Sequence, residues 1–329
     1  MVPPKITSST PTSPQKIKET PQKHDKPSSQ ALGLFWAMLS PVFLGTVPIL
    51  AKLAFEVNVP LMTLVAFRTI SAALILWVAI LVFAPSFITS SKPAIIGSLI
   101  AGSINGFGSI FFYASLTQID ASLGQLINIT YLVFVTVLLR LAGQSVSFLT
   151  LARTGLTIFA IFLLTVGSIG EPNWLGVGMM LVAALMYAIQ LVLSQRIMLD
   201  IPAPTMTLYA MTAMAAVVTV AWLFNPTSLS IVSPVGWQII LAMGLATALA
   251  RLTLFLGVKS LGSLQTALLG VFEVIVTIGI ANFLLDEQLT LVQWVGAAIL
   301  IISILLVRYE RDVPKFFDWW QYIWRWIYR

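Results

Sequence analysis

The sequence contains no cysteine, and its only histidine is His24. Disulfide bonds and thiol chemistry are therefore excluded. Charged residues are also scarce, at 9% of the 329 residues, whereas a soluble globular domain has about 25%. Apolar residues make up 58% of the chain. Such a chain cannot cover a water-facing surface, so most of its exterior must face lipid.

The same absences disfavour several functions. Intramembrane enzymes generally need His, Cys, a Ser nucleophile with a base, or paired carboxylates, whereas the apolar part of this chain has a single interior carboxylate, Glu273. We therefore expect no enzyme activity, no metal site and no cofactor. No GxxxxGK[ST] phosphate-binding loop is present, which disfavours an ATP-driven pump. A receptor or a non-catalytic scaffold is disfavoured because no extramembrane domain is apparent.

Ten apolar runs dominate the sequence, and each is close to the roughly 20 residues that cross a bilayer as a helix. They cover approximately 33–54, 60–83, 94–116, 122–142, 149–169, 174–195, 204–224, 236–258, 263–285 and 290–307. The sequence therefore predicts an all-α integral membrane protein with ten transmembrane helices.

The two ends of the chain differ from this apolar part. Residues 1–31 are rich in Pro, Ser, Thr and Lys, a composition that predicts a disordered tail. Residues 309–329 combine many aromatic residues with a stripe of Lys and Arg, which predicts an amphipathic helix on the membrane surface. Lys and Arg gather in the segments that share a side with both termini, so both termini are expected in the cytoplasm. The net charge of +6 is therefore a topology signal, and we expect no nucleic-acid partner.

The chain also repeats itself. Residues 122–155 align without gaps with residues 263–296, at an offset of 141, and the tripeptide Met-Thr-Leu at 62–64 recurs at 206–208. These matches predict two halves of five helices, 32–169 and 170–308. Because five is odd, the second half would be inverted, which is a recurring construction of secondary transporters. A duplication retained for stability alone is the alternative.

The stretch LLGVFEVIVTIGIANFLLDEQLTLVQWVGAAILIISILLV, residues 268–307, resembles the ninth and tenth helices of EamA-type members of the drug/metabolite transporter superfamily. Glu273, Glu287, Gln293 and Gly296 match the family's pattern there. The resemblance covers about residues 32–308.

This resemblance implies a secondary transporter of small polar metabolites that works by alternating access in the cell (inner) membrane, with an organelle membrane as the alternative location. Its expected partners are a small-molecule substrate and the lipid bilayer. Amino acids or related metabolites would be exported, and proton coupling and a homodimer remain open. A nucleotide-sugar or sugar-phosphate antiporter of the same superfamily is the alternative, although phosphate recognition calls for several converging cations.

The sequence departs from the family pattern in its prolines. Val274 replaces the usual proline after Glu273, and the fourth span lacks the proline expected near Leu132. Since proline is the usual cause of a sharp kink, these departures put in doubt a gating mechanism that relies on kinked fourth and ninth helices.

Glu273 is the main candidate for function. A carboxylate facing lipid costs about 2.5–3.5 kcal/mol even on the lenient insertion scale, so Glu273 should face the bundle interior. A rise of 1.5 Å per residue puts Arg251 at a similar depth, and Arg68 approaches from the outer side. Three interpretations stay open: a structural ion pair with Arg251, a group that binds a substrate ammonium or carries a coupling proton, and a permanently protonated side chain.

Other polar side chains near the middle of the membrane are candidates for substrate binding. They are Asn105, Tyr113, Asn128, Tyr131 and Gln190. Such groups can orient a zwitterionic metabolite, but for any one of them an interhelical hydrogen bond worth about 0.6 kcal/mol is the favoured interpretation. Gly102 and Gly106 form a GxxxG pattern that predicts close helix packing.

Overall fold

The computed structural model describes residues 27–141, 148–167, 173–224, 226–261 and 263–306. All regular structure in these ranges is helical. Most of the predicted N-terminal tail and the whole predicted surface helix, residues 309–329, lie outside the described residues.

Eleven α-helices and two short 3₁₀ helices follow one another along the described ranges. They are α1 (Pro27–Glu56), α2 (Leu61–Phe83), η1 (Pro85–Phe87), α3 (Lys92–Leu116), α4 (Ala121–Asn128), α5 (Tyr131–Leu141), α6 (Phe148–Val166), α7 (Trp174–Ile197), α8 (Ala203–Phe224), η2 (Leu229–Ile231), α9 (Pro234–Leu261), α10 (Ser263–Leu284) and α11 (Leu291–Leu305). Each of the ten predicted apolar runs falls on one or two of these helices.

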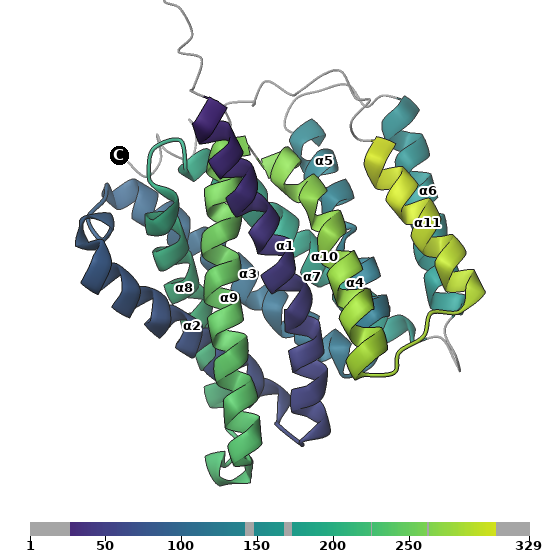
Figure 1. The fold of residues 1–329 in the computed structure, drawn as a ribbon, viewed down its shortest axis with the longest axis horizontal. Helices are drawn as coiled ribbons and strands as arrows, with labels where there is room; N and C mark the ends of the chain where they lie inside the picture. Colours follow the sequence, from purple (N-terminus) through teal and green to yellow (C-terminus); the bar gives the residue numbers. More distant parts are fainter. Residues whose placement is uncertain (1–26, 142–147, 168–172, 225, 262, 307–329) are drawn as a thin grey trace, which may run out of the picture.

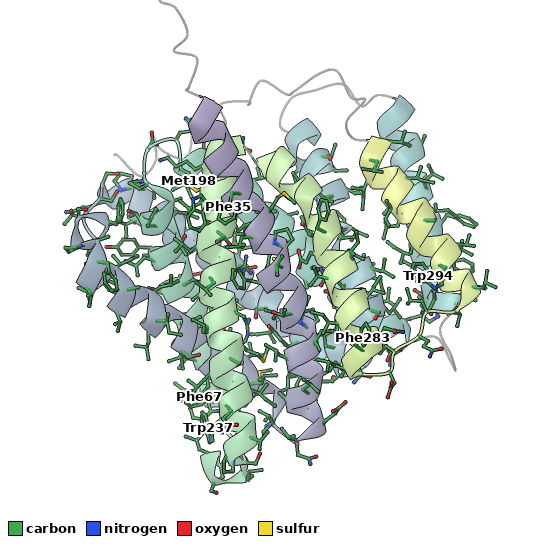
Figure 2. The ribbon with its side chains drawn as sticks, in the orientation of Figure 1. Phe35, Phe67, Met198, Trp237, Phe283 and Trp294 are labelled. Atoms are coloured by element: carbon green, nitrogen blue, oxygen red, sulfur yellow. The ribbon has the colours of Figure 1, made fainter. Side chains whose placement is uncertain are left out.

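Seven segments within the described ranges are long and apolar enough to cross a membrane, and three shorter apolar helices accompany them. The shorter ones are Gly155–Val166, Phe272–Leu284 and Leu291–Leu305. The all-helical membrane architecture is thus confirmed, while the count of ten spans stays a prediction. Large apolar side chains cover the outside of the bundle. Phe283 is 87% exposed and Trp294 is 55% exposed, and both are labelled in Figure 2. Lipid is the environment that suits such a surface.

The helices of the two halves pack in matching pairs. Helix α1 lies along α9, as the corresponding α7 lies along α3, and α2 contacts α9 as α8 contacts α3. Helices α2 and α8 contact each other, and so do α6 and α11, which lie side by side at the right of Figure 1. The contacts are therefore nearly unchanged when each helix is exchanged for its counterpart in the other half. This pattern agrees with the two sequence repeats.

The predicted GxxxG packing is confirmed. A Cβ atom added at Gly102 would lie 2.1 Å from the Ala210 carbonyl oxygen, and one added at Gly106 would lie 2.9 Å from Val217 Cβ. Glycine at both positions lets the backbones of α3 and α8 approach closely. This contact joins the first half of the chain to the second.

The first helix begins earlier than predicted. Residues 27–31, assigned to the disordered tail from their polar composition, form the first turn of α1. Pro27 is compatible with that position, because the first N–H groups of a helix have no partner within the helix. The tail prediction was therefore too long by five residues.

The fourth span is interrupted although it contains no proline. Helix α4 ends at Asn128 and α5 begins at Tyr131. Across this junction Thr130 N donates to the Ile127 carbonyl and Leu132 N to the Ile129 carbonyl, at 3.1 Å each, so the chain tightens into 3₁₀-type bonds. Asn and Thr are weak helix formers, which favours a break here. The missing proline therefore does not make this span a single continuous helix.

Candidate functional site

A cavity of about 70 Å³ lies inside the bundle. It is lined by Leu44, Val47, Arg68, Asn105, Gly108, Ser109, Phe112, Tyr113, Asn128, Ala183, Tyr187, Met214, Thr247, Arg251 and Glu273. These residues come from α1–α4 in the first half and from α7–α10 in the second. The same helices of each half thus contribute, whereas α6 and α11 do not.

Arg68, in α2, is held by groups from both halves. Its guanidinium donates to Ser109 Oγ at 2.6 Å and to Thr247 Oγ1 at 3.1 Å. The guanidinium carbon also lies 4.4 Å from the centre of the Tyr113 ring, within the range of a cation–π contact. Only 3% of the residue is exposed, and its Nε atom has no hydrogen-bond partner. Every recorded partner of this buried cation is neutral.

Arg251, in α9, has a similar environment. It donates to Gln190 Oε1 at 3.3 Å, and its guanidinium carbon lies 5.1 Å from the centre of the Tyr187 ring. The residue is 9% exposed, and its Nε atom also has no partner. The hydrogen-bond and ring partners of this second buried cation are therefore neutral as well.

Glu273, in α10, is positioned by a close contact with α1. A Cβ atom added at Gly45 would lie 2.9 Å from the Glu273 carbonyl oxygen, so glycine is needed for the two helices to approach. The Thr277 hydroxyl lies 2.9 Å from both the Gly45 and the Glu273 carbonyl oxygens and can donate to either. This bridge fixes the backbone that carries the carboxyl group, and 5% of Glu273 is exposed.

The structure brings Glu273 and Arg251, its expected partner, to one cavity. Both side chains line the same cavity, which agrees with the depth predicted from the helical rise. The hydrogen bond recorded for the Arg251 guanidinium, however, goes to Gln190 and not to the carboxylate. The three interpretations of Glu273 therefore stay predictions.

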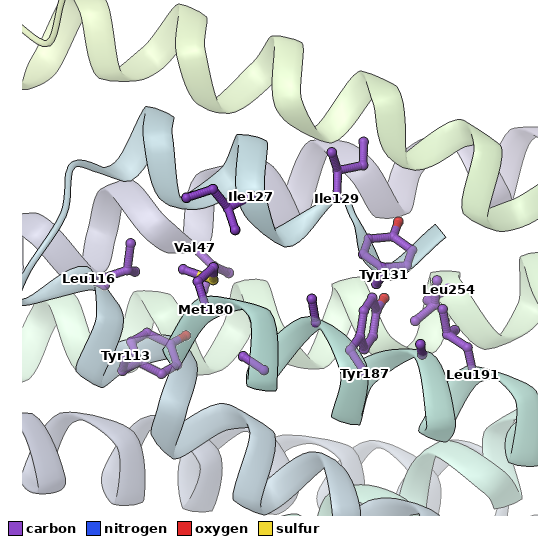
Figure 3. Close-up of a cluster of buried hydrophobic side chains, with 14 of the residues drawn as sticks. Val47, Tyr113, Leu116, Ile127, Ile129, Tyr131, Met180, Tyr187, Leu191 and Leu254 are labelled. Carbon is purple, nitrogen blue, oxygen red and sulfur yellow. The ribbon is translucent and has the colours of Figure 1, made fainter. Parts of the chain in front are cut away.

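A second, smaller cavity of about 10 Å³ lies beside the first. Its lining includes Tyr131 as well as Tyr187 and Glu273, which line both cavities. The rings of Tyr131 and Tyr187 meet edge to face, with centres 4.7 Å apart (Figure 3). A Cβ atom added at Gly270 would lie 2.1 Å from the Tyr131 hydroxyl oxygen, so this ring occupies space that only glycine leaves free.

The eight predicted site residues lie close together. Six of them line the larger cavity, namely Arg68, Asn105, Tyr113, Asn128, Arg251 and Glu273. Tyr131 lines the smaller cavity, and Gln190 contacts Arg251. The Asn105 amide lies 3.3 Å from Met214 Sδ. The location of these residues agrees with the prediction, while their roles in binding or coupling stay predictions.

Sequence reasoning missed three polar residues of the cavity: Ser109, Thr247 and Tyr187. Residues four apart lie on one face of a helix, and Ser109 precedes Tyr113 by four positions, as Thr247 precedes Arg251. Tyr187 precedes Gln190 by three. Helical spacing around the chosen residues could therefore have identified all three.

A separate polar contact joins the α10–α11 loop to the start of α4. The Glu287 carboxylate accepts hydrogen bonds from the backbone N–H groups of Ala121 and Ser122, at 2.8 Å each. An acidic group is favoured at a helix N-terminus, where N–H groups lack partners. Burial, and then the Glu287 carboxylate, raise the pKa of the neighbouring Asp120, while Lys52 opposes this shift. Within the described ranges, no group of three His, Asp or Glu side chains could hold a metal ion.

Comparison with known proteins gives two findings. The EamA-like transporter family matches the chain twice, over residues 31–166 and 174–309. Of the solved structures, 28 chains match. One, titled "Crystal structure of protein", has a TM-score of 0.61 and 17% identity over 87% of this chain and 100% of that chain, which supports the fold alone. No curated protein matches.

Proposed function

Because the chain belongs to the EamA-like transporter family, we propose that it is a secondary active transporter of small polar metabolites that works by alternating access. Members of this family are transporters and not enzymes. The substrate and the mechanism are our proposal. Amino acids and related metabolites, moved out of the cell, are the first substrates to test.

The observation that carries this proposal is the polar cavity inside an otherwise apolar bundle. Its lining comes from the same four spans of each half, so a movement of one half against the other would change access to it. Secondary transporters built from repeats hold their substrates at such an interface. The break between α4 and α5 supports the same proposal, because Asn128 at the end of α4 lines the cavity and interrupted helices often carry transporter sites.

We propose a cell-membrane location with both termini in the cytoplasm. The distribution of Lys and Arg along the sequence supports this orientation. The Glu287 contact with α4 would then lie on the outer side, and the smaller cavity near Tyr131 on the cytoplasmic side of Glu273.

Glu273 is the candidate for coupling transport to protons. It is the only carboxylate in the cavity lining and it also lines the smaller cavity, so it can meet protons from either one. Transient protonation is a common role for a carboxylate within the membrane.

Reconstitution into liposomes with a trapped pH dye tests this function. A panel of amino acids and organic acids would be added to liposomes that contain the wild type or Glu273→Gln. Substrate-dependent proton movement that the variant loses, at unchanged thermal stability, would support transport and coupling. Proton movement that continues in the variant would reject the coupling role. The same compounds would also be added in labelled form. If none of them enters liposomes that contain the wild type, the transport proposal is wrong.

The antiporter of sugar phosphates is a second candidate, since two arginines line one cavity. A volume of about 70 Å³ nevertheless favours a small metabolite over a nucleotide sugar. Including a triose phosphate in the panel separates the two candidates.

A further inference from the structure

The larger cavity has an excess of positive charge. Its lining contains two arginines, Arg68 and Arg251, and one carboxylate, Glu273. The remaining lining residues are neutral or apolar. The net charge of the lining is therefore positive whether Glu273 is ionised or protonated.

The direct contacts of the two arginines supply no negative charge to balance this excess. Arg68 contacts two hydroxyl groups and a tyrosine ring, and Arg251 contacts an amide oxygen and a tyrosine ring. Such contacts satisfy some N–H groups but supply no negative charge. Buried charges in proteins are normally paired, because an unpaired one loses its hydration without compensation. An anion in the cavity would supply what the lining lacks.

Both arginines also retain donors for a ligand. A guanidinium carries five N–H donors in a planar fork, and the recorded hydrogen bonds use two on Arg68 and one on Arg251. The Nε atom of each side chain is buried without a partner. Both guanidinium groups line the same cavity. A planar oxyanion between them would accept hydrogen bonds from both forks and supply the negative charge that their present partners lack.

We infer that the substrate is a small organic acid with one net negative charge, whose carboxylate is bound between Arg68 and Arg251. This inference rests on the proposed transport function and narrows its substrate class. A monoanion balances the cavity when Glu273 is ionised. A neutral zwitterion would leave the excess charge in place, and a cation would add to it. Neutral and basic amino acids are therefore poor substrates, whereas acidic amino acids and simple carboxylates are good ones.

Ligand binding to the purified protein tests the charge preference without requiring transport. The probes are L-aspartate and L-asparagine, which have nearly the same shape and differ by one charge, together with pyruvate and L-lysine. The thermal midpoint in detergent should rise with aspartate or pyruvate and stay constant with asparagine and lysine. The inference is overturned if neither anion raises the midpoint, or if asparagine or lysine binds as tightly as the anions.

Substitutions then test the site. Arg68→Gln and Arg251→Gln should each weaken anion binding by about 30-fold or more, because a buried charge loses its partner. The corresponding Lys variants should recover part of the affinity, since they keep the charge but not the fork. Arg196→Gln is the matched control, because Arg196 lies in the last turn of α7 and outside the cavity lining. Anion affinity that is equal in all the Gln variants would overturn the inference.

Transport of the same probes separates this inference from the proposed function. Uptake of anions alone into liposomes supports both. Uptake of asparagine or lysine with exclusion of the anions overturns the anion site and leaves the transporter. Anion binding in detergent without uptake of any probe overturns the transporter and leaves the anion site.

Discussion

The contact between α3 and α8 gives the sharpest stability prediction. In Gly102→Ala the new Cβ atom would lie 2.1 Å from the Ala210 carbonyl oxygen and 2.6 Å from its Cα atom. Ordinary contact begins near 3.4 Å, so the two helices must separate by about 1.3 Å. Both atoms belong to the backbone and cannot rotate away. Overpacking of this kind costs about 1–3 kcal/mol, and more where nothing can yield.

An opposing effect is small. Replacing glycine by alanine inside a helix gains roughly 0.5–1 kcal/mol, because the unfolded chain loses conformational freedom. Because the backbone atoms of Ala210 cannot yield, the overpacking cost should lie toward the upper end of this range, and we expect the free energy of unfolding of Gly102→Ala to fall by about 1–2 kcal/mol. The measurement is a reversible denaturant titration in mixed detergent micelles, followed by tryptophan fluorescence.

Gly178→Ala is the matched control. Gly178 lies within α7, and a Cβ atom added there would meet no atom within 4 Å. This variant should equal or exceed the wild type in stability. If Gly102→Ala also equals the wild type in stability, α3 and α8 do not approach each other as closely as the structure shows. If Gly102→Ala separates α3 and α8 as expected, it should also change transport, because Asn105 and Met214 meet across the same pair of helices at the cavity.

Three further changes test single contacts. Glu287→Gln removes the charge from two hydrogen bonds at the start of α4, so the same titration should show a loss of about 1–2 kcal/mol, and an unchanged value would reject this cap. The pKa of Asp120 is raised in the folded protein above the ordinary aspartate pKa of 3.8. Ionisation of this carboxyl group therefore lowers the free energy of unfolding as the pH rises above 3.8. Asp120→Asn should therefore raise the thermal midpoint more at about pH 8 than at about pH 4, whereas an equal shift at both would contradict the sign. Gly270→Ala should displace the Tyr131 ring and slow transport in liposomes, while Gly279→Ala, with no atom within 4 Å of the new Cβ, should match the wild type.

The membrane fold could be predicted because its main signal is local. Apolar runs and small-residue spacing identify helices and close contacts without knowledge of the partner, as Gly102 and Gly106 illustrate. The break at residues 129–130 could not be predicted in this way. At this break 3₁₀-type bonds form beside Asn128 and Thr130, two weak helix formers, and such residues do not give the clear signal that a proline would.

The site was predicted in part. Glu273 and Arg251 stand out in the sequence because charges are rare within apolar runs, and both line the cavity. The hydrogen bond of Arg251 to Gln190 could not be read from depth alone. The rise per residue gives the position along a helix axis, whereas the direction of a side chain also depends on how each helix is rotated about its axis. That rotation is set by packing against the other helices, which the sequence does not state.

The proposed anion site would link substrate binding to the proposed movement of the two halves. Arg68 belongs to the first half, whereas Arg251 and Glu273 belong to the second. A carboxylate held by both arginines would therefore bridge the halves. A ligand shifts a conformational equilibrium only by its difference in affinity between the states. If one half moves against the other, the distance between the two guanidinium groups changes, and so does the affinity for a bridging anion. A neutral substrate that contacts one half alone would have no such effect. The placement of the two arginines on different halves would thus let the proposed anionic substrate favour one arrangement of the halves.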